Sequence, residues 1–292
     1  MVIDCAGKPL DLSRPAVMGV LNLTPDSFSG DGLLDLDAAC ERALAMQAAG
    51  AAVIDIGGES TRPGARPVTA AEELRRVLPV IERLAPRLAV PISIDTRHAE
   101  VMRAAVKAGA GLINDIAALR EPGALDAAAA LGVPVILMHM QGEPGTMQQA
   151  PRYDDVVGEV LAFLDQRLAA CRRAGIADDR VLLDPGFGFG KTAAHNLALL
   201  RDLAQFARLR RPLVVGLSRK SLIGDLTGAP VAGRLGGSIA LAVLAAERGA
   251  QVLRVHDVEC TVQALAMLAA VQRAAPVAGV YGAPSSLKVG NP

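Results

Sequence analysis

Aromatic residues are scarce in this chain of 292 residues, which has no tryptophan, two tyrosines and five phenylalanines. Its core must therefore be built mainly from aliphatic side chains, and 51% of the residues are hydrophobic. Two of the five phenylalanines, Phe187 and Phe189, nevertheless stand two positions apart in one glycine-rich segment. General core packing does not explain this pairing, so the segment deserves a specific explanation.

The chain also lacks an excess of charge, because 30 basic residues balance 30 acidic ones. No overall field then attracts nucleic acid or an anionic membrane, and we expect neither as a partner. No apolar run approaches the roughly 20 residues of a membrane span. The first ten residues lack the basic and apolar segments of a signal peptide.

Cysteine is rare as well, and the four cysteines show no metal-binding spacing. A cytoplasmic protein with reduced thiols is the expectation that follows. The four residues are Cys5, Cys40, Cys171 and Cys260.

What the chain does have is a series of eight short apolar runs, each followed by a segment with helical periodicity. Continuous apolar runs are typical of parallel strands covered on both faces. Eight such units predict an α/β fold, a single-domain (β/α)8 TIM barrel, for which about 250 residues is usual. An open, doubly wound sheet is the competing arrangement. The runs are 16–21, 52–56, 92–94, 111–113, 133–138, 181–183, 213–215 and 251–255.

Local signals predict how the chain begins, continues and ends. Residues 1–14 predict a short N-terminal hairpin that closes the bottom of the barrel, and residues 15–274 form the barrel itself. Thr69 with Glu72 predicts a capping box before a helix, and the apolar segment 238–248 predicts a well-buried helix. The tail 275–292, rich in Gly, Pro and Ser, is expected to be flexible.

The glycine-rich segment LLDPGFGFGKT, residues 182–192, resembles a phosphate-binding loop only superficially. A P-loop needs a glycine five residues before Gly190, and that position holds Pro185, which has no N–H to donate. The dinucleotide pattern G-x-G-x-x-G fails because the three glycines are spaced by two throughout. A flexible turn between strand and helix is the plain alternative.

Polar residues follow the predicted strands, and in a barrel all eight strand ends converge on one face. For Asp95 the alternative role is the N-cap of the next helix, and for Asp115 that capping role is the one we expect. Asp184 precedes Pro185 and a glycine loop, so capping explains it less well. The polar residues at the strand ends are Asn22, Thr61, Arg62, Asp95, Asn114, Asp115, His139, Asp184, Ser218, Lys220, Arg254 and His256.

This set of side chains suits a flat heterocycle with a phosphorylated arm. Asp95, Asn114 and Asp184 can accept or donate hydrogen bonds along a ring edge, because a carboxylate accepts two parallel N–H bonds. Lys220 can meet a ring carbonyl or nitrogen. Three further assignments complete the outline: Arg254, His256 and Arg62 for phosphate, Asn22 for a magnesium ion through oxygen, and Phe189 for stacking on the ring.

Eight segments together resemble the dihydropteroate synthase family, in order and with the spacing that the family uses. The resemblance covers about residues 15–273. The segments are MGVLNLTPDSFS (18–29), DIGGESTRPGA (55–65), SIDT (93–96), LINDI (112–116), LMHMQGEPGTMQ (137–148), LLDPGFGFGK (182–191), GLSRKSLIG (216–224) and RVHD (254–257).

The resemblance implies a homodimeric (β/α)8 barrel that joins 4-aminobenzoate to 6-hydroxymethyl-7,8-dihydropterin diphosphate, giving 7,8-dihydropteroate and diphosphate. It further implies inhibition by sulfonamides. Asp95, Asp184, Lys220 and Arg254 are the implied catalytic residues, and Asn22 is the implied Mg²⁺ ligand. The implied substrate-binding residues are Phe28, Thr61, Arg62, Pro63, Asp95, Asn114, Met138, Asp184, Phe189, Gly216, Ser218, Lys220, Arg254 and His256.

The chain departs slightly from the family pattern, since the segment after Phe28 is short and Leu23 replaces a common valine. Three other functions stay open at this stage. They are a pterin-binding methyltransferase barrel, a Schiff-base aldolase that uses Lys220, and a non-catalytic paralogue. The loops 22–32 and 60–67 are expected to close over the site.

Overall fold

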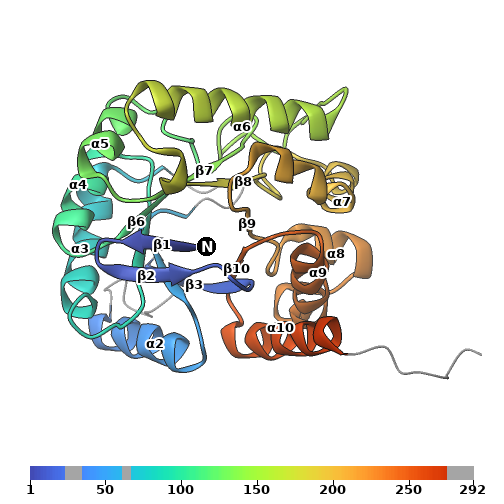
Figure 1. Ribbon diagram of the computed structural model, residues 1–292, viewed down its shortest axis with the longest axis horizontal. Helices are drawn as coiled ribbons and strands as arrows, with labels where there is room; N and C mark the ends of the chain where they lie inside the picture. The colour runs from blue at the N-terminus through green and yellow to red at the C-terminus, as the bar shows by residue number, and fades with distance from the viewer. Residues whose placement is uncertain (24–34, 61–66, 275–292) are drawn as a thin grey trace, which may run out of the picture.

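The computed structural model of the chain describes residues 1–23, 35–60 and 67–274. Eight parallel strands form one sheet in the order β8-β7-β6-β5-β4-β3-β10-β9, with helices around it (Figure 1). Each predicted apolar run is a strand. The strands are β3 (Ala16–Asn22), β4 (Val53–Gly57), β5 (Ile92–Asp95), β6 (Leu112–Asp115), β7 (Val135–Met138), β8 (Val181–Asp184), β9 (Val214–Val215) and β10 (Val252–Val255).

The two ends of this sheet meet, and the meeting distinguishes a barrel from an open sheet. Leu183 of β8 forms a parallel bridge with Leu213, which directly precedes β9. The Leu183 N–H donates to the carbonyl of Pro212 at 2.9 Å. The predicted (β/α)8 fold is therefore confirmed, and the competing doubly wound sheet is wrong.

Helices surround the sheet as the periodicity predicts. Thr69 accepts the Glu72 N–H at 3.3 Å, while the Glu72 carboxylate pairs with Arg76, so one half of the predicted capping box forms. The helices are α2 (Leu36–Ala48), α3 (Ala70–Leu84), α4 (Ala99–Lys107), α5 (Ala124–Leu131), α6 (Val156–Arg173), α7 (Ala193–Arg201), α8 (Ser221–Thr227), α9 (Leu235–Glu247) and α10 (Val258–Arg273). Among the described residues, none of these helices is long and apolar enough to span a membrane.

The burial expected of α9 is wrong on one side of that helix. Ala242, Ala245 and Ala246 pack inward, but Leu235 and Leu244 are 41% and 36% exposed. The apolar composition of α9 showed that it would be a helix, yet an almost uniformly apolar segment has no periodicity to show which side is covered.

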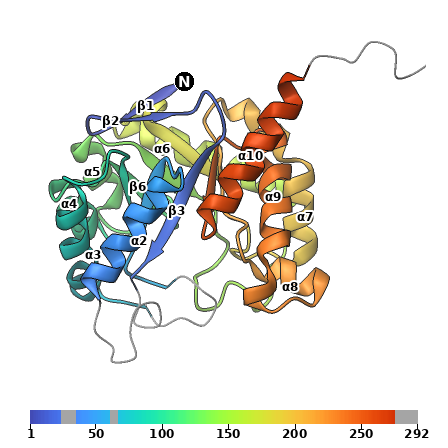
Figure 2. The same cartoon turned by 90° about the horizontal axis from the view of Figure 1, so that it is seen from below.

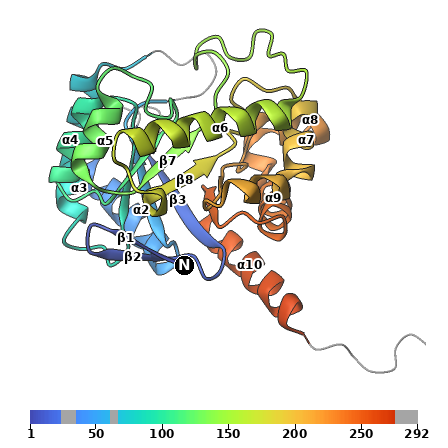
Figure 3. The same ribbon diagram turned by 45° about the horizontal axis from the view of Figure 1, so that its top comes forward.

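The N-terminal hairpin forms as predicted, from β1 (Val2–Cys5) and β2 (Lys8–Asp11). It lies across the end of the barrel from which β3 starts (Figures 2 and 3). Ile3 and Leu10 pack on Met18 and other side chains inside the barrel. The ammonium of Lys8 donates to the carbonyls of Ala85 and Leu88 at 2.9 and 2.7 Å. The hairpin thus closes the bottom of the barrel and leaves the carboxyl ends of the strands for the site.

Candidate active site

Arg254, on β10, lies at the centre of the polar cluster that the strand ends form. Its Nε donates to Asp55 Oδ2 at 2.6 Å, and its Nη2 donates to Asp95 Oδ2 at 2.7 Å. Since these residues come from β4, β5 and β10, the guanidinium joins strands far apart in sequence. The convergence of strand-end side chains is as the sequence predicts.

Asp55 is a site residue that the sequence reasoning missed. It is fully buried, and besides Arg254 it accepts a hydrogen bond from Asn114 Nδ2 at 3.3 Å. The signal was present, because a charged residue in the middle of the apolar run VIDIG must point toward a polar partner. Asp55 lies within its strand, whereas the other polar groups of the site lie near or after the ends of theirs.

Asp184 and the glycine loop, residues 184–191, form the next part of the site. The Asp184 Oδ1 accepts the Gly186 N–H at 2.7 Å, so its carboxylate turns back over the loop and does not cap α7. Gly186 has φ +71°, and a Cβ there would collide with the carbonyl of His139. Glycine is therefore required at this turn by both conformation and space.

Lys220 and Phe189 face each other across the same region. The Lys220 ammonium lies 4.2 Å from the centre of the Phe189 ring, a cation–π contact. A small apolar cluster separate from the main core continues this wall; its members are Ile116, Met138, Met140, Met147 and Phe189. The site therefore combines charged groups with an apolar wall, as binding a flat ring requires.

Burial sets the electrostatics of the site. It raises the pKa of Asp95, against the opposing charge of Arg254, and it raises the pKa of Asp184. Burial and the nearby Arg254 lower the pKa of Lys220 to about 8. Burial alone would lower the pKa of Arg254, but Asp55 and Asp95 reverse this and raise it, so the guanidinium stays charged.

His256 and Ser218 form a pair beside Arg254. The Ser218 hydroxyl accepts the backbone N–H of His256 at 3.2 Å and lies 3.1 Å from Nδ1 of the His256 ring. Burial and the charge of Arg254 lower the pKa of His256 to about 4, so its ring is neutral at pH 7. Gly216 lies against the Arg254 side chain, where a Cβ would stand 3.8 Å from that of Arg254.

Asn22, at the end of β3, lies near Asp95. A Cβ on Gly57 would stand 3.6 Å from Asp95 Oδ2 and 3.8 Å from Asn22 Oδ1, so both oxygens border this glycine. Across residues 1–23, 35–60 and 67–274, no group of three or more His, Cys, Asp or Glu side chains could hold a metal ion. A metal at Asn22 would take most of its ligands from elsewhere.

Several further polar residues bind protein groups around the strand ends. Asp115 accepts the N–H groups of Ala117 and Leu119 in the turn after β6. Its predicted role as the N-cap of the next helix is wrong, because α5 begins after Gly123. His98 is the N-cap of α4, and His195 lies in the first turn of α7. Lys191, which the sequence left without a role, is buried within the glycine loop.

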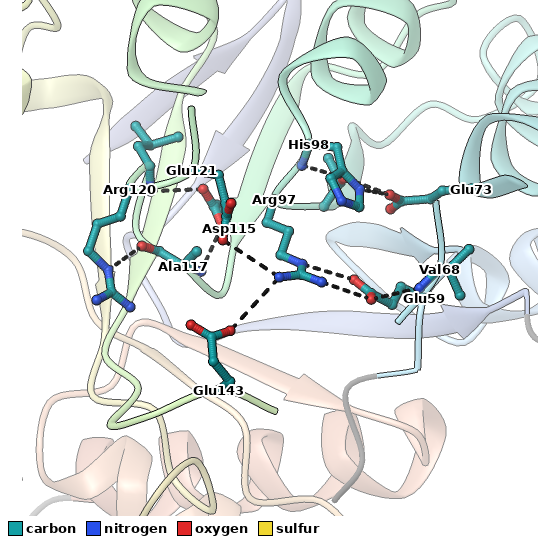
Figure 4. A network of polar contacts seen from close by, with 12 residues as sticks. Glu59, Val68, Glu73, Arg97, His98, Asp115, Ala117, Arg120, Glu121 and Glu143 are labelled. Carbon is teal, nitrogen blue, oxygen red and sulfur yellow. Dashed lines mark hydrogen bonds and ion pairs between the residues drawn. The ribbon is translucent and has the colours of Figure 1, made fainter. Parts of the chain in front are cut away.

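Arg97 links the loops at the carboxyl ends of four strands (Figure 4). Its guanidinium donates twice to Glu59, at 3.3 Å each, and lies 3.6 and 3.9 Å from carboxylate oxygens of Glu121 and Glu143. The same Glu59 accepts the Val68 N–H at 3.2 Å. A cavity of about 190 Å³ lies beside this network, lined by Arg97, Ala117, Arg120, Glu121, Met140 and Glu143.

Four predicted site residues lie outside the described residues, namely Phe28, Thr61, Arg62 and Pro63. The same holds for most of the two loops expected to close over the site and for the tail 275–292. Their roles stay predictions. The residues that the structure brings together are Asn22, Asp95, Asn114, Met138, Asp184, Phe189, Gly216, Ser218, Lys220, Arg254 and His256.

Solved structures with this fold provide an independent comparison. A Yersinia pestis dihydropteroate synthase in a sulfonamide drug complex is 53% identical, with a TM-score of 0.90, over 94% of this chain and 100% of that one. A Xanthomonas albilineans dihydropteroate synthase in complex with 7,8-dihydropteroate is 52% identical, with a TM-score of 0.87 and the same coverage.

Sequence comparison agrees with the structures. Residues 18–256 match the family described as pterin binding enzyme. The dihydropteroate synthase of Escherichia coli K12 is 54% identical over 274 residues, which cover 92% of this chain and 96% of that protein. The Haemophilus influenzae enzyme is 50% identical over 262 residues. The chain therefore belongs to the pterin-binding enzymes and, within them, to the dihydropteroate synthase family.

Proposed function

We propose that this member of the dihydropteroate synthases condenses 6-hydroxymethyl-7,8-dihydropterin diphosphate with 4-aminobenzoate at the mouth formed by Asp95, Asn114, Asp184, Lys220 and Arg254. The observation that carries the proposal is the convergence of acidic, amide and cationic groups beside an apolar wall. The products are 7,8-dihydropteroate and diphosphate.

The pterin ring is held along its polar edges and on one face. Asp184 and Asn114 supply hydrogen-bonding groups for the ring edge, where each charged hydrogen bond contributes about 1.5–3 kcal/mol. Phe189 and Met138 supply apolar contact for the ring face. Lys220, beside Phe189, meets a ring carbonyl or nitrogen. A ligand without matching donors would leave these buried groups unpaired, and this mismatch gives selectivity.

The diphosphate leaves toward the opposite side of the mouth. Arg254 is charged and lies beside His256, whose neutral ring can donate a hydrogen bond from one nitrogen. Fixed donors that meet charge as it develops are an efficient means of stabilising a departing anion. Arg62 joins this group by its position in the family motif.

The chemical step breaks the bond between the pterin methylene carbon and a diphosphate oxygen. The same carbon then forms a bond with the amine nitrogen of 4-aminobenzoate, and the surplus proton passes to solvent or to the departing diphosphate. Asp95 and Asp184 favour positive charge on the bound ring before the amine attacks. Phe28, Thr61, Pro63 and Ser218 are assigned to the aminobenzoate and diphosphate regions.

The site suits a magnesium ion that is bound together with the diphosphate. The amide oxygen of Asn22 lies beside Asp95 at the mouth, and Mg²⁺ prefers oxygen ligands from one or two protein groups together with substrate phosphates and water. When bound, the ion neutralises charge on the diphosphate.

We also propose that two copies of the chain associate through α8, α9 and α10. α9 packs side by side with α10 (Figures 1 and 2), and α8 borders α9 where Ile223 lies against Gly237. Six of the nine large hydrophobic side chains that are exposed among the described residues lie on or between them, namely Leu226, Val231, Leu235, Leu244, Met267 and Val271. Several exposed apolar side chains on neighbouring helices are typical of an interface. The four free thiols support a cytoplasmic location.

One assay tests the proposed reaction. Diphosphate release should require the pterin diphosphate, 4-aminobenzoate and magnesium together, and sulfonamides should compete with 4-aminobenzoate. A folded protein that binds pterin and releases no diphosphate would instead be a non-catalytic paralogue. Light scattering tests the association: we expect a dimer, and a monomer for Met267→Glu with Val271→Glu.

A further inference from the structure

Lys191 is a buried cation to which the proposed reaction assigns no role. Lys191 is the last residue of the glycine loop, and it is only 3% exposed. Burial lowers the pKa of Lys191 to about 7, with the nearby Asp184 opposing that shift. Burying an ammonium group is costly unless each N–H finds an acceptor. The N–H groups of Lys191 therefore need acceptors inside the protein.

Three acceptors lie within 3.0 Å of the Lys191 ammonium, and the His139 carbonyl is a fourth at 3.5 Å. It donates to the carbonyls of Gly186 at 2.8 Å and Phe189 at 3.0 Å, both within the glycine loop. The third acceptor is Nδ1 of His139 at 2.9 Å, in the segment after β7. Burial lowers the pKa of His139 to about 3, so its ring is neutral and this nitrogen can accept. The ammonium thus joins the glycine loop to the neighbouring strand end.

Other side chains bind three further backbone groups of the loop. Gln148 donates to the Gly188 carbonyl at 2.5 Å, and the Tyr153 hydroxyl donates to the Gly190 carbonyl at 2.9 Å. The Gly188 N–H donates to Asn196 at 2.8 Å. Glycines with positive φ have little intrinsic preference for one conformation. The shape of the loop is therefore set by the side chains that bind its backbone, and Lys191 binds it twice.

We propose that Lys191 is a positioning residue for the pterin site: its ammonium ties the carbonyls of Gly186 and Phe189 to His139 and so holds Asp184 and the Phe189 ring where the pterin binds. The inference rests on the proposed function, because Asp184 and Phe189 matter here as pterin contacts. Lys191 itself touches no substrate in this arrangement.

The geometry connects Lys191 to both groups. The Gly186 N–H donates to Asp184, so the residue whose carbonyl Lys191 binds also orients the carboxylate. The Phe189 carbonyl belongs to the residue whose ring meets Lys220. The Lys191 charge also helps to offset the burial that raises the pKa of Asp184. Loss of the ammonium should loosen the carboxylate and the ring together.

The test compares Lys191→Met with Lys8→Met. Lys8 also donates to two backbone carbonyls, but at the closed bottom of the barrel. We expect K191M to raise the KM for the pterin diphosphate and the Kd for the pterin alone by about tenfold or more, the worth of one charged hydrogen bond. The KM for 4-aminobenzoate should change less than about twofold, and K8M should leave both KM values unchanged while lowering the melting temperature.

Each outcome decides the proposal. Unchanged pterin affinity in folded K191M, or an equal rise in both KM values, would overturn it. If K191M does not fold, Lys191→Arg carries the test, because it keeps the charge but displaces the donors and should weaken pterin binding severalfold; unchanged affinity there counts against the proposal. If wild-type protein binds no pterin, the proposed function fails first, which the wild-type titration shows directly.

Discussion

Among single residues, Asp184 carries the sharpest prediction. Asp184→Asn keeps an oxygen that can accept the Gly186 N–H but removes the negative charge that faces the site. We expect kcat/KM to fall roughly 10- to 100-fold, the equivalent of one charged hydrogen bond, with an unchanged melting temperature. Steady-state kinetics and thermal unfolding measure the two quantities. Near-normal turnover would show that Asp184 does not grip the pterin.

His98 predicts a pH dependence of stability. The hydrogen bond that His98 Nδ1 donates to Glu73 Oε2, at 2.8 Å, holds the pKa of His98 above its ordinary value of 6.5, against the effect of burial. Since the folded pKa is raised, the stabilisation is fully present below pH 6.5 and is lost as pH rises through the folded pKa. His98→Gln should therefore cost about 0.5–1 kcal/mol at pH 6 and much less at pH 9. Urea unfolding at both pH values measures this, and a cost independent of pH would contradict it.

The sequence predicted most of the residues at the mouth, because polar groups directly after apolar strands are conspicuous. It did not predict Asp55 or the role of Lys191. Asp55 lies within a strand, and its partners Arg254 and Asn114 are distant in sequence. The acceptors of Lys191 are mostly backbone carbonyls, which every residue has, so no side-chain pattern announces them.

Among the elements, the loops that follow β4 to β7 share the Arg97 network. Glu59 and Val68 bracket the segment that carries Thr61, Arg62 and Pro63. Arg97→Gln should free Glu59 and raise the KM for 4-aminobenzoate about 2- to 5-fold, since an ion pair of this kind contributes on the order of 0.5–1 kcal/mol. Arg103→Gln, an exposed arginine on α4, is the matched control and should change nothing. If the two variants have the same kinetics, the Arg97 network does not contribute to the reaction.

Helices and strands differ in how well the sequence predicts which of their faces are buried. Each strand was predictable because a buried strand needs a continuous apolar run. The outer side of α9 was not, since its exposed leucines have the same composition as buried ones. If the proposed dimer forms, those leucines find their cover on a second chain, which a single sequence does not display.

For the whole molecule, the closed and open ends of the barrel should respond independently to mutation. Leu10 is 1% exposed and packs into the bottom of the barrel. Leu10→Ala should lower the free energy of unfolding by about 2–5 kcal/mol, while both KM values stay unchanged. Denaturant unfolding with parallel kinetics tests this. A changed KM would mean that packing at the hairpin reaches the site.

The seam where β8 meets β9 and closes the barrel should be the part of the sheet that opens most easily. β9 has two residues, and the junction with β8 is formed by the bridge between Leu183 and Leu213. The backbone amides there should exchange with deuterium sooner than those of the well-paired β3 and β4, because fewer hydrogen bonds must break together. Asp184 follows one side of this seam and Lys220 the other. A pterin bound by both residues would link the two sides of the seam. Pterin binding should therefore slow deuterium exchange at the Leu183 amide, although this amide lies within the barrel wall and does not contact the ligand.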